Sequence, residues 1–141
     1  MLTLAGQIQR ASDAAKGCAA RLSGTDAPSF PDVEKTFPEL QERIRKTLDF
    51  LKSVPASSID GSEERAISLK AGKNEYNFTG TQYLQGFAIP NFFFHVSVAY
   101  AILRHKGVQI GKMDFWARSA PDPAKRSIRF PPGISKECVE F

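Results

Sequence analysis

The chain has 141 residues, a formal net charge of +4 and a pI near 9.2, and this length predicts a single domain. Its composition, with 42% hydrophobic and 24% charged residues, is typical of a globular protein. It excludes a fully disordered chain, a collagen and a disulfide scaffold. The basic residues form no block, so we expect no nucleic-acid partner.

Cysteine usage and the termini bear on the cellular compartment. Cys18 and Cys138 are too few for a metal cluster or a framework of bridges, and we predict one core thiol and one exposed thiol. The N-terminus has no basic region followed by a long apolar run, so it is not a signal peptide. Phe87 to Leu103 is the one long apolar run, and Pro90 interrupts it. We interpret this run as a buried helix and expect a soluble, cytoplasmic protein with no membrane partner.

The first predicted helix covers about Leu2 to Leu22. Its apolar residues recur at steps of three and four and so form one stripe. The stripe consists of Leu4, Ile8, Ala11, Ala15, Cys18 and Leu22. Asp13 and Lys16 lie on the opposite face, where we expect a solvated ion pair. Gly24 follows the predicted end of the helix.

A loop with two prolines precedes the second predicted helix, which opens at Thr36. Thr36 and Glu39 have the spacing of a capping box, in which each side chain bonds the other residue's backbone amide. The apolar stripe of this helix consists of Phe37, Leu40, Ile44, Leu48 and Leu51. Its wet face consists of Glu42, Arg45, Lys46 and Asp49. Pro55 ends the helix.

Two short alternating runs, Arg65 to Leu69 and Glu75 to Phe78, predict a β-hairpin between helices. An isolated hairpin is marginally stable, so we expect this one to lie on the helices. The third predicted helix runs from Thr81 to Lys106, with Gly107 as its C-terminal cap. Pro90 should kink this helix.

The third helix is apolar on nearly all sides between Phe87 and Leu103, which predicts a position in the middle of a bundle. From Trp116 onward no periodicity is visible and prolines are frequent. We therefore predict an irregular or disordered tail over residues 116–141.

The segment FAIPNFFFHVSVAYAILRHKGVQIGKMDF, Phe87 to Phe115, resembles the C-terminal signature of an uncharacterised domain-of-unknown-function family. That family is grouped with the DinB/YfiT-like four-helix bundles. The segments Gln7 to Gly17, Phe37 to Leu51 and Phe78 to Gly80 agree with it. The resemblance covers residues 2–115. It implies a mainly α, up-down DinB/YfiT-like bundle with a small β-hairpin before the last long helix.

The resemblance also bears on domain organisation. Members of the family usually carry another helix before the segment matched by Leu2, and they usually end soon after the position of Phe115. We therefore expect a DinB-like domain over residues 1–115 with three of the usual four helices. We expect residues 116–141 to be an unrelated tail.

The resemblance further implies a possible metal site. Many DinB-like bundles bind a divalent metal, such as zinc or nickel, through three histidines. One histidine comes from the second helix and two come, one turn apart, from the last. Gln7 stands near the place of the first, His95 matches the second, and Ala99 (Val98 on a looser alignment) stands at the third. Glutamine is a poor ligand for such metals and alanine is none, so the resemblance implies at most a degenerate site at His95.

Asn91 and His95 are four residues apart and share a face, as the strongly polar groups well inside the apolar stretch. Three interpretations of His95 stay open. It is a satisfied buried histidine bonded to Asn91, Gln7 or a backbone carbonyl, a proton-transfer or ligand-contact residue, or part of a degenerate metal site. His105 lies at the helix end, where a cation is favoured. Whether the chain is an enzyme stays open.

Three hypotheses of function follow. The first is a small-molecule-binding or cryptic enzyme module with a polar pocket at His95, Asn91 and Gln7. The second is a non-catalytic interaction module that self-associates through the apolar groove left by the missing helix. The third is a truncated fragment of a longer family member. For assembly we expect a homodimer through that groove, or a poorly soluble, partly molten chain.

Deletion of residues 116–141 tests the predicted domain boundary. We expect the melting midpoint to stay nearly unchanged, because the tail has no apolar stripe to bury. Thermal unfolding of the full and shortened chains measures this. A drop of several degrees would contradict the boundary and would show that the tail docks, through Trp116, Phe130 or Ile134.

Overall fold

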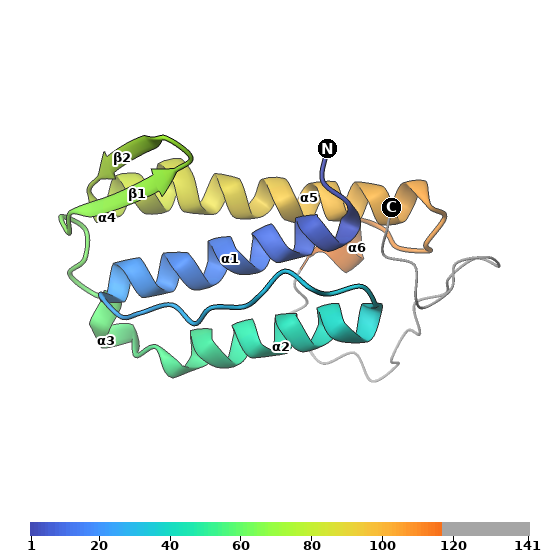
Figure 1. The fold of residues 1–141 in the computed structure, drawn as a ribbon, viewed down its shortest axis with the longest axis horizontal. Coiled ribbons are helices and arrows are strands. Elements are labelled where there is room, and N and C mark those ends of the chain that lie inside the picture. Colours follow the sequence, from blue (N-terminus) through green and yellow to red (C-terminus); the bar gives the residue numbers. More distant parts are fainter. Residues whose placement is uncertain (117–141) are drawn as a thin grey trace.

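Three long helices and one β-hairpin form the architecture (Figure 1). The structure is a computed structural model that describes residues 1–116, apart from the side chain of Ala71. The predicted tail over 117–141 and the predicted exposed thiol of Cys138 lie outside the described residues. The elements are α1 (Leu4–Ser23), α2 (Phe37–Ser53), α3 (Ala56–Ile59), β1 (Ile67–Ala71), β2 (Asn74–Phe78), α4 (Gly80–Gln82), the π-helix η1 (Tyr83–Ala88), α5 (Ile89–His105) and α6 (Lys112–Phe115).

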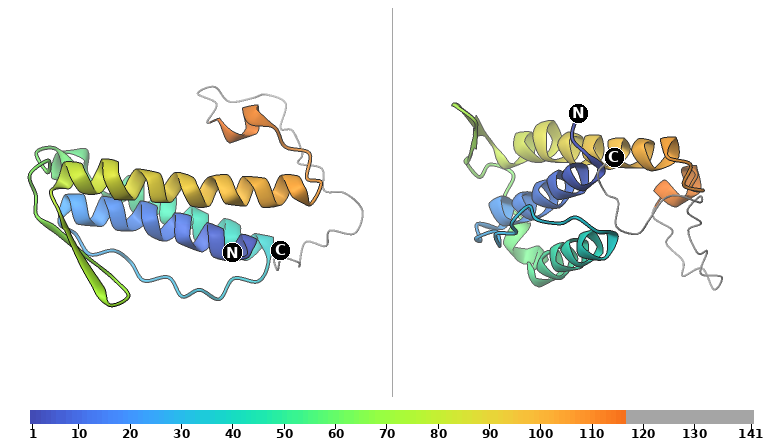
Figure 2. Two further views of the ribbon diagram at one scale, coloured as in Figure 1. Left: turned by 90° about the horizontal axis from the view of Figure 1, so that it is seen from above. Right: turned by 45° about the vertical axis from the view of Figure 1, so that its right-hand side comes forward.

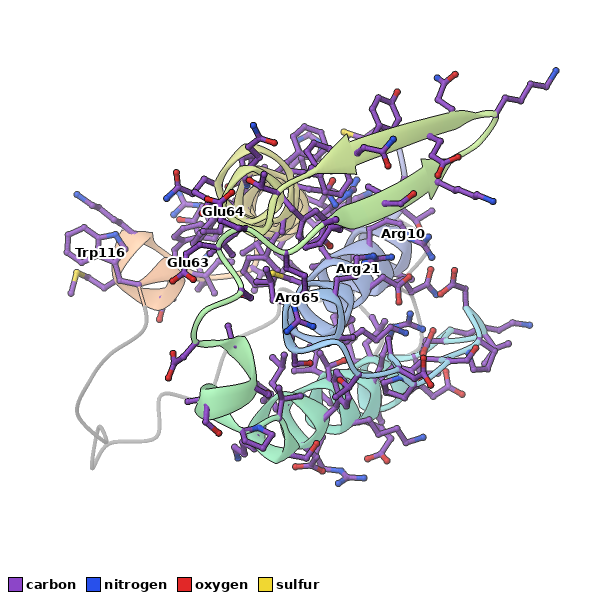
Figure 3. The ribbon with its side chains drawn as sticks, turned by 90° about the vertical axis from the view of Figure 1, so that its left-hand side faces the viewer. Arg10, Arg21, Glu63, Glu64, Arg65 and Trp116 are labelled. Carbon is purple, nitrogen blue, oxygen red and sulfur yellow. The ribbon has the colours of Figure 1, made fainter. Side chains whose placement is uncertain are left out.

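Helix α1 lies between the other two long helices. It packs against α2 on one side and against α5 on another, and Figure 1 shows α5 above α1 and α2 below it. At one end Leu4, Leu40 and Ile102 form a buried cluster from all three helices. In a view close to the helix axes, α1 stands at the corner between two arms, α2 and α5 (Figure 3). Among residues 1–116, no long helix lies at the fourth corner.

The ends of α1 and α2 follow local sequence signals. The Thr3 hydroxyl accepts a hydrogen bond from the amide of Gly6 at the start of α1, and Gly24 ends the helix in the left-handed region with φ 74°. At the start of α2, Thr36 and Glu39 form the predicted capping box. These features confirm the predicted boundaries to within two residues.

The hairpin lies on the end of the bundle. Strands β1 and β2 are antiparallel, with Ile67 opposite Phe78 and Leu69 opposite Tyr76. Ile67 and Leu69 point into a buried cluster with Leu22, Tyr83 and Ala88. The predicted hairpin and its contact with the helices are therefore confirmed.

Helices α4, η1 and α5 form one continuous helix, Gly80–His105, close to the predicted range. The expected disturbance by Pro90 takes the form of a π-helical turn. The amide of Ile89 bonds the carbonyl of Leu84, five residues back, and the wider turn accommodates the proline ring, which would otherwise crowd the carbonyl of Gly86. Gly107 takes a left-handed conformation, with φ 83°, as predicted for a residue just past the helix end.

The prediction that Phe87 to Leu103 is a buried helix is wrong for the described chain. Only 11% of the most apolar stretch of Gly80–His105 is buried. The physical reason is that only α1 packs along α5, so most of its circumference has no neighbour among the described helices. In length and composition Gly80–His105 is also the one described helix able to cross a membrane, a property that core helices of water-soluble proteins share.

The short helix α6 is not predicted by the sequence pattern. The chain turns back after α5, and Phe115 packs edge-on against Tyr100 with ring centroids 5.6 Å apart. α6 thereby lies beside the C-terminal end of α5, on the open side of the bundle (Figure 2).

Gly80 tests how tightly the long helix starts against the preceding loop. A Cβ at this position would lie 1.9 Å from the carbonyl oxygen of Ser62. We expect Gly80→Ala to lower the free energy of unfolding by about 1–3 kcal/mol, because backbone has to move. Gly86→Ala is the matched control, since a Cβ there meets nothing within 4 Å. Urea unfolding measures both, and equal stability of the two variants would contradict the tight contact.

Candidate functional site

An open apolar trough runs along α1 between α2 and α5. Its floor consists of Gln7, Ile8, Ala11, Ser12, Ala15 and Cys18. Its walls consist of Ile44, Thr47, Leu48 and Leu51 from α2, and Ile89, Phe92, Val96, Ala99, Tyr100 and Leu103 from α5. The trough comprises two adjoining cavities of about 480 and 360 Å³ that share Ala15, Leu51 and Phe92.

The trough forms because the predicted apolar stripes of all three helices converge on the open corner. The stripe of α1 supplies the floor, and small side chains at Ala11 and Ala15 keep it low. The predicted apolar stripe of α2 is partly uncovered: Ile44 is 40% exposed and Leu48 is 48% exposed. The cause is the absence of a described helix at the fourth corner.

The trough is long and nearly free of charge. Fifteen helical steps from Gln7 to Leu22 correspond to about 22 Å at 1.5 Å per residue. Among the described lining residues Asp114, at the α6 end, is the one charged side chain. Its carboxylate already accepts a hydrogen bond from the amide of Gly111, at 2.7 Å.

Polar groups on the floor are mostly satisfied within the chain. The Oε1 atom of Gln7 lies 2.7 Å from Nδ1 of His95, and its amide nitrogen donates to the carbonyl of Leu2 at 3.3 Å. The hydroxyl of Thr47 donates to the carbonyl of Arg43 at 2.9 Å. Ser12 is buried, and its hydroxyl makes no hydrogen bond within the described part of the chain. It is therefore available to an occupant.

The structure brings together two of the predicted site residues, Gln7 and His95. Burial lowers the pKa of His95, and the nearby positive charge of Arg10 lowers it further, so the ring is neutral at pH 7. A neutral ring that faces an amide oxygen carries its proton on Nδ1 and donates it. Gln7 and His95 therefore join α1 to α5 by a partly buried hydrogen bond.

The remaining predicted site residues lie apart from this pair. Asn91 is half-buried, one turn before His95, and no hydrogen bond joins it to His95 or Gln7 in residues 1–116. Ala99 lines the trough and has no donor atom. His105 is exposed at the end of α5, as expected.

The residues present do not fit a zinc or nickel ion. Nδ1 of His95 and the amide oxygen of Gln7 satisfy each other, and the third position is Ala99. The described residues hold no group of three or more His, Cys, Asp or Glu side chains able to bind a metal.

A buried ion network on the other side of α1 was not predicted. Arg43 is fully buried, and its guanidinium contacts three carboxylates. The distances are 2.9 Å to Asp13, 3.1 Å to Asp32 and 3.0 Å to Glu34. Lys16 joins the network 2.9 Å from Asp13 and is itself buried, so the predicted ion pair exists, but its lysine is buried instead of solvated. The network ties α2 and the preceding loop to α1.

Electrostatics hold this network in its charged form. Burial opposes ionisation of Glu34, but hydrogen bonds from Gln9 and Arg43 outweigh it and keep the pKa of this carboxyl below its usual range. Burial opposes the charge of Arg43, but the hydrogen bond and charge of Glu34, together with the charges of Asp13 and Asp32, raise its pKa. One signal in the sequence could have indicated the network. Arg43 follows Leu40 by three residues and so lies on the helix face that contacts α1.

The sequence of this chain matches a known protein family. The family described as "Domain of unknown function (DUF1993)" matches residues 1–116. The chain belongs to the DUF1993 family. No curated protein matches it.

This DUF1993 chain is also similar to a solved structure. The chain is similar to the crystal structure of a DinB family member protein from Shewanella denitrificans, with 36% identity and a TM-score of 0.77. The match covers 87% of this DUF1993 chain and 70% of that chain. The predicted fold class, a mainly helical DinB-like bundle with a small hairpin, is confirmed.

Arg43→Met tests the ion network in the DUF1993 chain. Loss of the buried cation removes one partner from each of three carboxylates, of which Asp13 keeps Arg10 and Lys16 and Asp32 keeps Arg10. We expect the free energy of unfolding to fall by about 3 kcal/mol. This is the low end for a buried pair, because Asp13 and Asp32 keep some contact with water. Arg45→Met, on the exposed face of α2, is the control and should leave the unfolding midpoint nearly unchanged. Similar midpoints for the two variants would contradict the role of the network.

His95→Ala tests the bond between α1 and α5. It leaves the buried oxygen of Gln7 without a partner, which should lower the free energy of unfolding by about 1–3 kcal/mol. The pKa of His95 is lowered in the folded chain. Wild-type stability should therefore decline as the pH falls below about 6.5.

The His95→Ala variant should lack that part of the pH dependence. His105→Ala is the control and should keep the wild-type stability at pH 7, because the side chain of His105 is exposed. Superimposable unfolding curves for His95→Ala and wild type, at pH 7 and at pH 5.5, would contradict the assignment.

Proposed function

We propose that this DUF1993 chain is a non-catalytic binding module whose trough receives an uncharged, apolar α-helix. The observation that carries the proposal is the open fourth corner, where three apolar stripes converge along about 22 Å without a charged side chain except Asp114. A helix placed there completes a four-helix arrangement around a shared core.

The dimensions of the trough suit a helix. Its length corresponds to about 15 helical residues, and packed helices lie 8–10 Å apart. The small floor residues Ala11 and Ala15 allow an occupant to approach α1 closely. Ile44 and Leu48 on one wall and Phe92 on the other offer apolar side chains to both of its flanks. Burial of these side chains supplies the driving force.

The electrostatics of the trough select the chemistry of the occupant. An unpaired charge buried against these walls would lose its hydration without gaining a partner, which is costly. An uncharged apolar face is therefore accepted and a charged face is rejected. Ser12 offers one hydroxyl to a polar group of the occupant.

The polar groups at the trough support binding rather than catalysis. The side chain best suited to proton transfer, His95, does not line the trough and is engaged with Gln7. The described lining residues hold no nucleophile paired with a base, which covalent catalysis requires. Cys18 is half-buried, and burial raises the pKa of its thiol, which disfavours the reactive thiolate.

A second candidate keeps the first hypothesis from the sequence, a small-molecule site, but moves it from His95 and Asn91 to the trough. The larger cavity, about 480 Å³, is within the size range of ligand pockets. The free hydroxyl of Ser12 on an apolar floor would orient such a ligand. An uncharged, mainly hydrocarbon molecule fits this chemistry.

A designed amphipathic helix tests the proposal. The probe is a peptide of about 15–18 residues with one leucine- and alanine-rich face and a charged opposite face, labelled for fluorescence anisotropy. We expect saturable binding to the chain and a rise in its melting midpoint. Leu48→Lys should abolish binding because it places a charge on the trough wall.

The matched control is Asp49→Lys, which introduces the same side chain on the charged face of α2 and should keep the binding. Failure of the peptide to bind at any dilution of the chain would overturn the proposal. Binding of the neutral dye Nile red, sensitive to Leu48→Lys, without peptide binding would favour the second candidate.

A further inference from the structure

We propose that the helix received by the trough is α5 of a second copy of this chain, in a two-fold dimer where each α5 fills the other's trough. This inference rests on the proposed function and names its partner. A single chain has an open trough and an uncovered face of α5, and in this dimer the two surfaces cover each other.

Both the trough and α5 are nearly free of charge, which favours α5 as the occupant. From Thr79 to Leu103 the chain contains no Asp, Glu, Lys or Arg, so the stretch that would enter is as uncharged as the trough. The far face of α2 carries Glu42, Arg45, Lys46 and Asp49, all exposed. Helix α1 carries the ion network instead. Among the three long helices, α5 is the one whose uncharged surface extends beyond the side that lines the trough.

The exposed side chains of α5 point to the same partner. Phe94 is 60% exposed and packs edge-on against His95. Phe93 is 51% exposed and stands two helical steps of about 100° from His95, which bonds α1, so it lies on the side of α5 turned away from α1. Ser97 and Ala101, one turn apart on that side, are small and allow a neighbouring helix to approach. A continuous exposed apolar surface of this kind marks an interface.

The arrangement of helices fixes the symmetry. In each chain α1 stands at the corner, with α2 and α5 at the two adjacent corners (Figure 3). A two-fold axis parallel to the α5 helices and midway between them brings each α5 to the open corner of the other chain. Two four-helix groups then share the α5 pair, and the interface is self-complementary. A perpendicular two-fold axis would place α1 of one chain on α2 of the other.

This symmetry predicts a specific contact. The face of α5 opposite α1, with Phe93 and Ser97, meets α2 of the partner chain where Ile44 and Leu48 are exposed. The contact occurs twice in the dimer. This one arrangement covers Ile44, Leu48 and Phe93, three side chains that are partly exposed in a single chain.

Sedimentation velocity tests the dimer and its contact, with variants that introduce opposite charges on the two sides of the contact. We expect the wild type to sediment as a dimer, and Phe93→Lys and Leu48→Glu each to sediment as monomers. All the substituted side chains are exposed, so the variants should keep the wild-type far-UV circular dichroism. Lys46→Glu, on the charged face of α2, is the control and should stay dimeric.

Mixing the two monomeric variants should restore a dimer with one Lys–Glu contact and one unaltered Phe93–Leu48 contact. A monomeric wild type, or a dimer that survives both single substitutions, would overturn this inference. Failure of the mixture to form a heterodimer would overturn the α5–α2 contact.

The same variants separate this inference from the proposed function. Phe93→Lys removes the entering face of α5 but leaves the trough intact, so it should bind the designed amphipathic peptide as a monomer. A monomeric wild type that binds the peptide would overturn the dimer and keep the helix-binding function. A monomer that does not bind the peptide would overturn the proposed function itself.

Discussion

The buried guanidinium of Arg43 sets the orientation of α2, and the rest of the architecture follows from it. Its contacts with Asp13 on α1 and with Asp32 and Glu34 in the preceding loop turn one face of α2 toward α1. Successive residues of a helix are about 100° apart, so Ile44 points away from α1 and toward the trough. The apolar stripe of α2 therefore borders an open corner instead of a closed core.

A buried ion network is an unusual way to join two helices in a small protein. A charged group loses hydration on burial, and only several partners with good geometry compensate for this loss. Arg43 has three carboxylate partners, while Lys16 lies 4.2 Å from the centre of the Phe30 ring. The loop before α2 is thus fixed by charge and by an aromatic contact. Because the ion network joins α1 to α2, apolar residues that could otherwise make this contact line the trough.

The Gln7–His95 pair has the corresponding role between α1 and α5. The resemblance to DinB-like bundles implies metal ligands at these two positions. Here the two side chains bond each other instead, with 2.7 Å between Oε1 of Gln7 and Nδ1 of His95. Ala99, at the third position, has no donor atom, and the bond between Gln7 and His95 joins α1 to α5. The open trough, and not this polar pair, is the surface on which the proposed function depends.

Local features of the fold were predictable from the sequence, and long-range ones were not. The capping box of Thr36 and Glu39 and the hairpin around Gly72 depend on residues a few positions apart, and both were predicted correctly. The Arg43 network joins residues up to 30 positions apart, and no local pattern indicates which carboxylates will meet.

The exposure of α5 was mispredicted for a related reason. Periodicity shows that a helix face is apolar, but it does not show whether a neighbour covers that face. Gln7 and His95 were named as candidates from the resemblance, and the structure brings them together. The trough was not predictable, because periodicity does not show that the apolar stripes of three helices face one corner.

Alkylation of Cys18 measures the central claim, that the trough is covered by a helix in solution. Cys18 lies on the trough floor, half-buried and beyond direct contact with bulk water once an occupant is in place. The account predicts that the rate of modification by iodoacetamide, followed by mass spectrometry of the Cys18 peptide, falls as chain concentration rises and the dimer forms. A rate that is the same in dilute and concentrated solution would contradict it, because the trough would then be equally open in both.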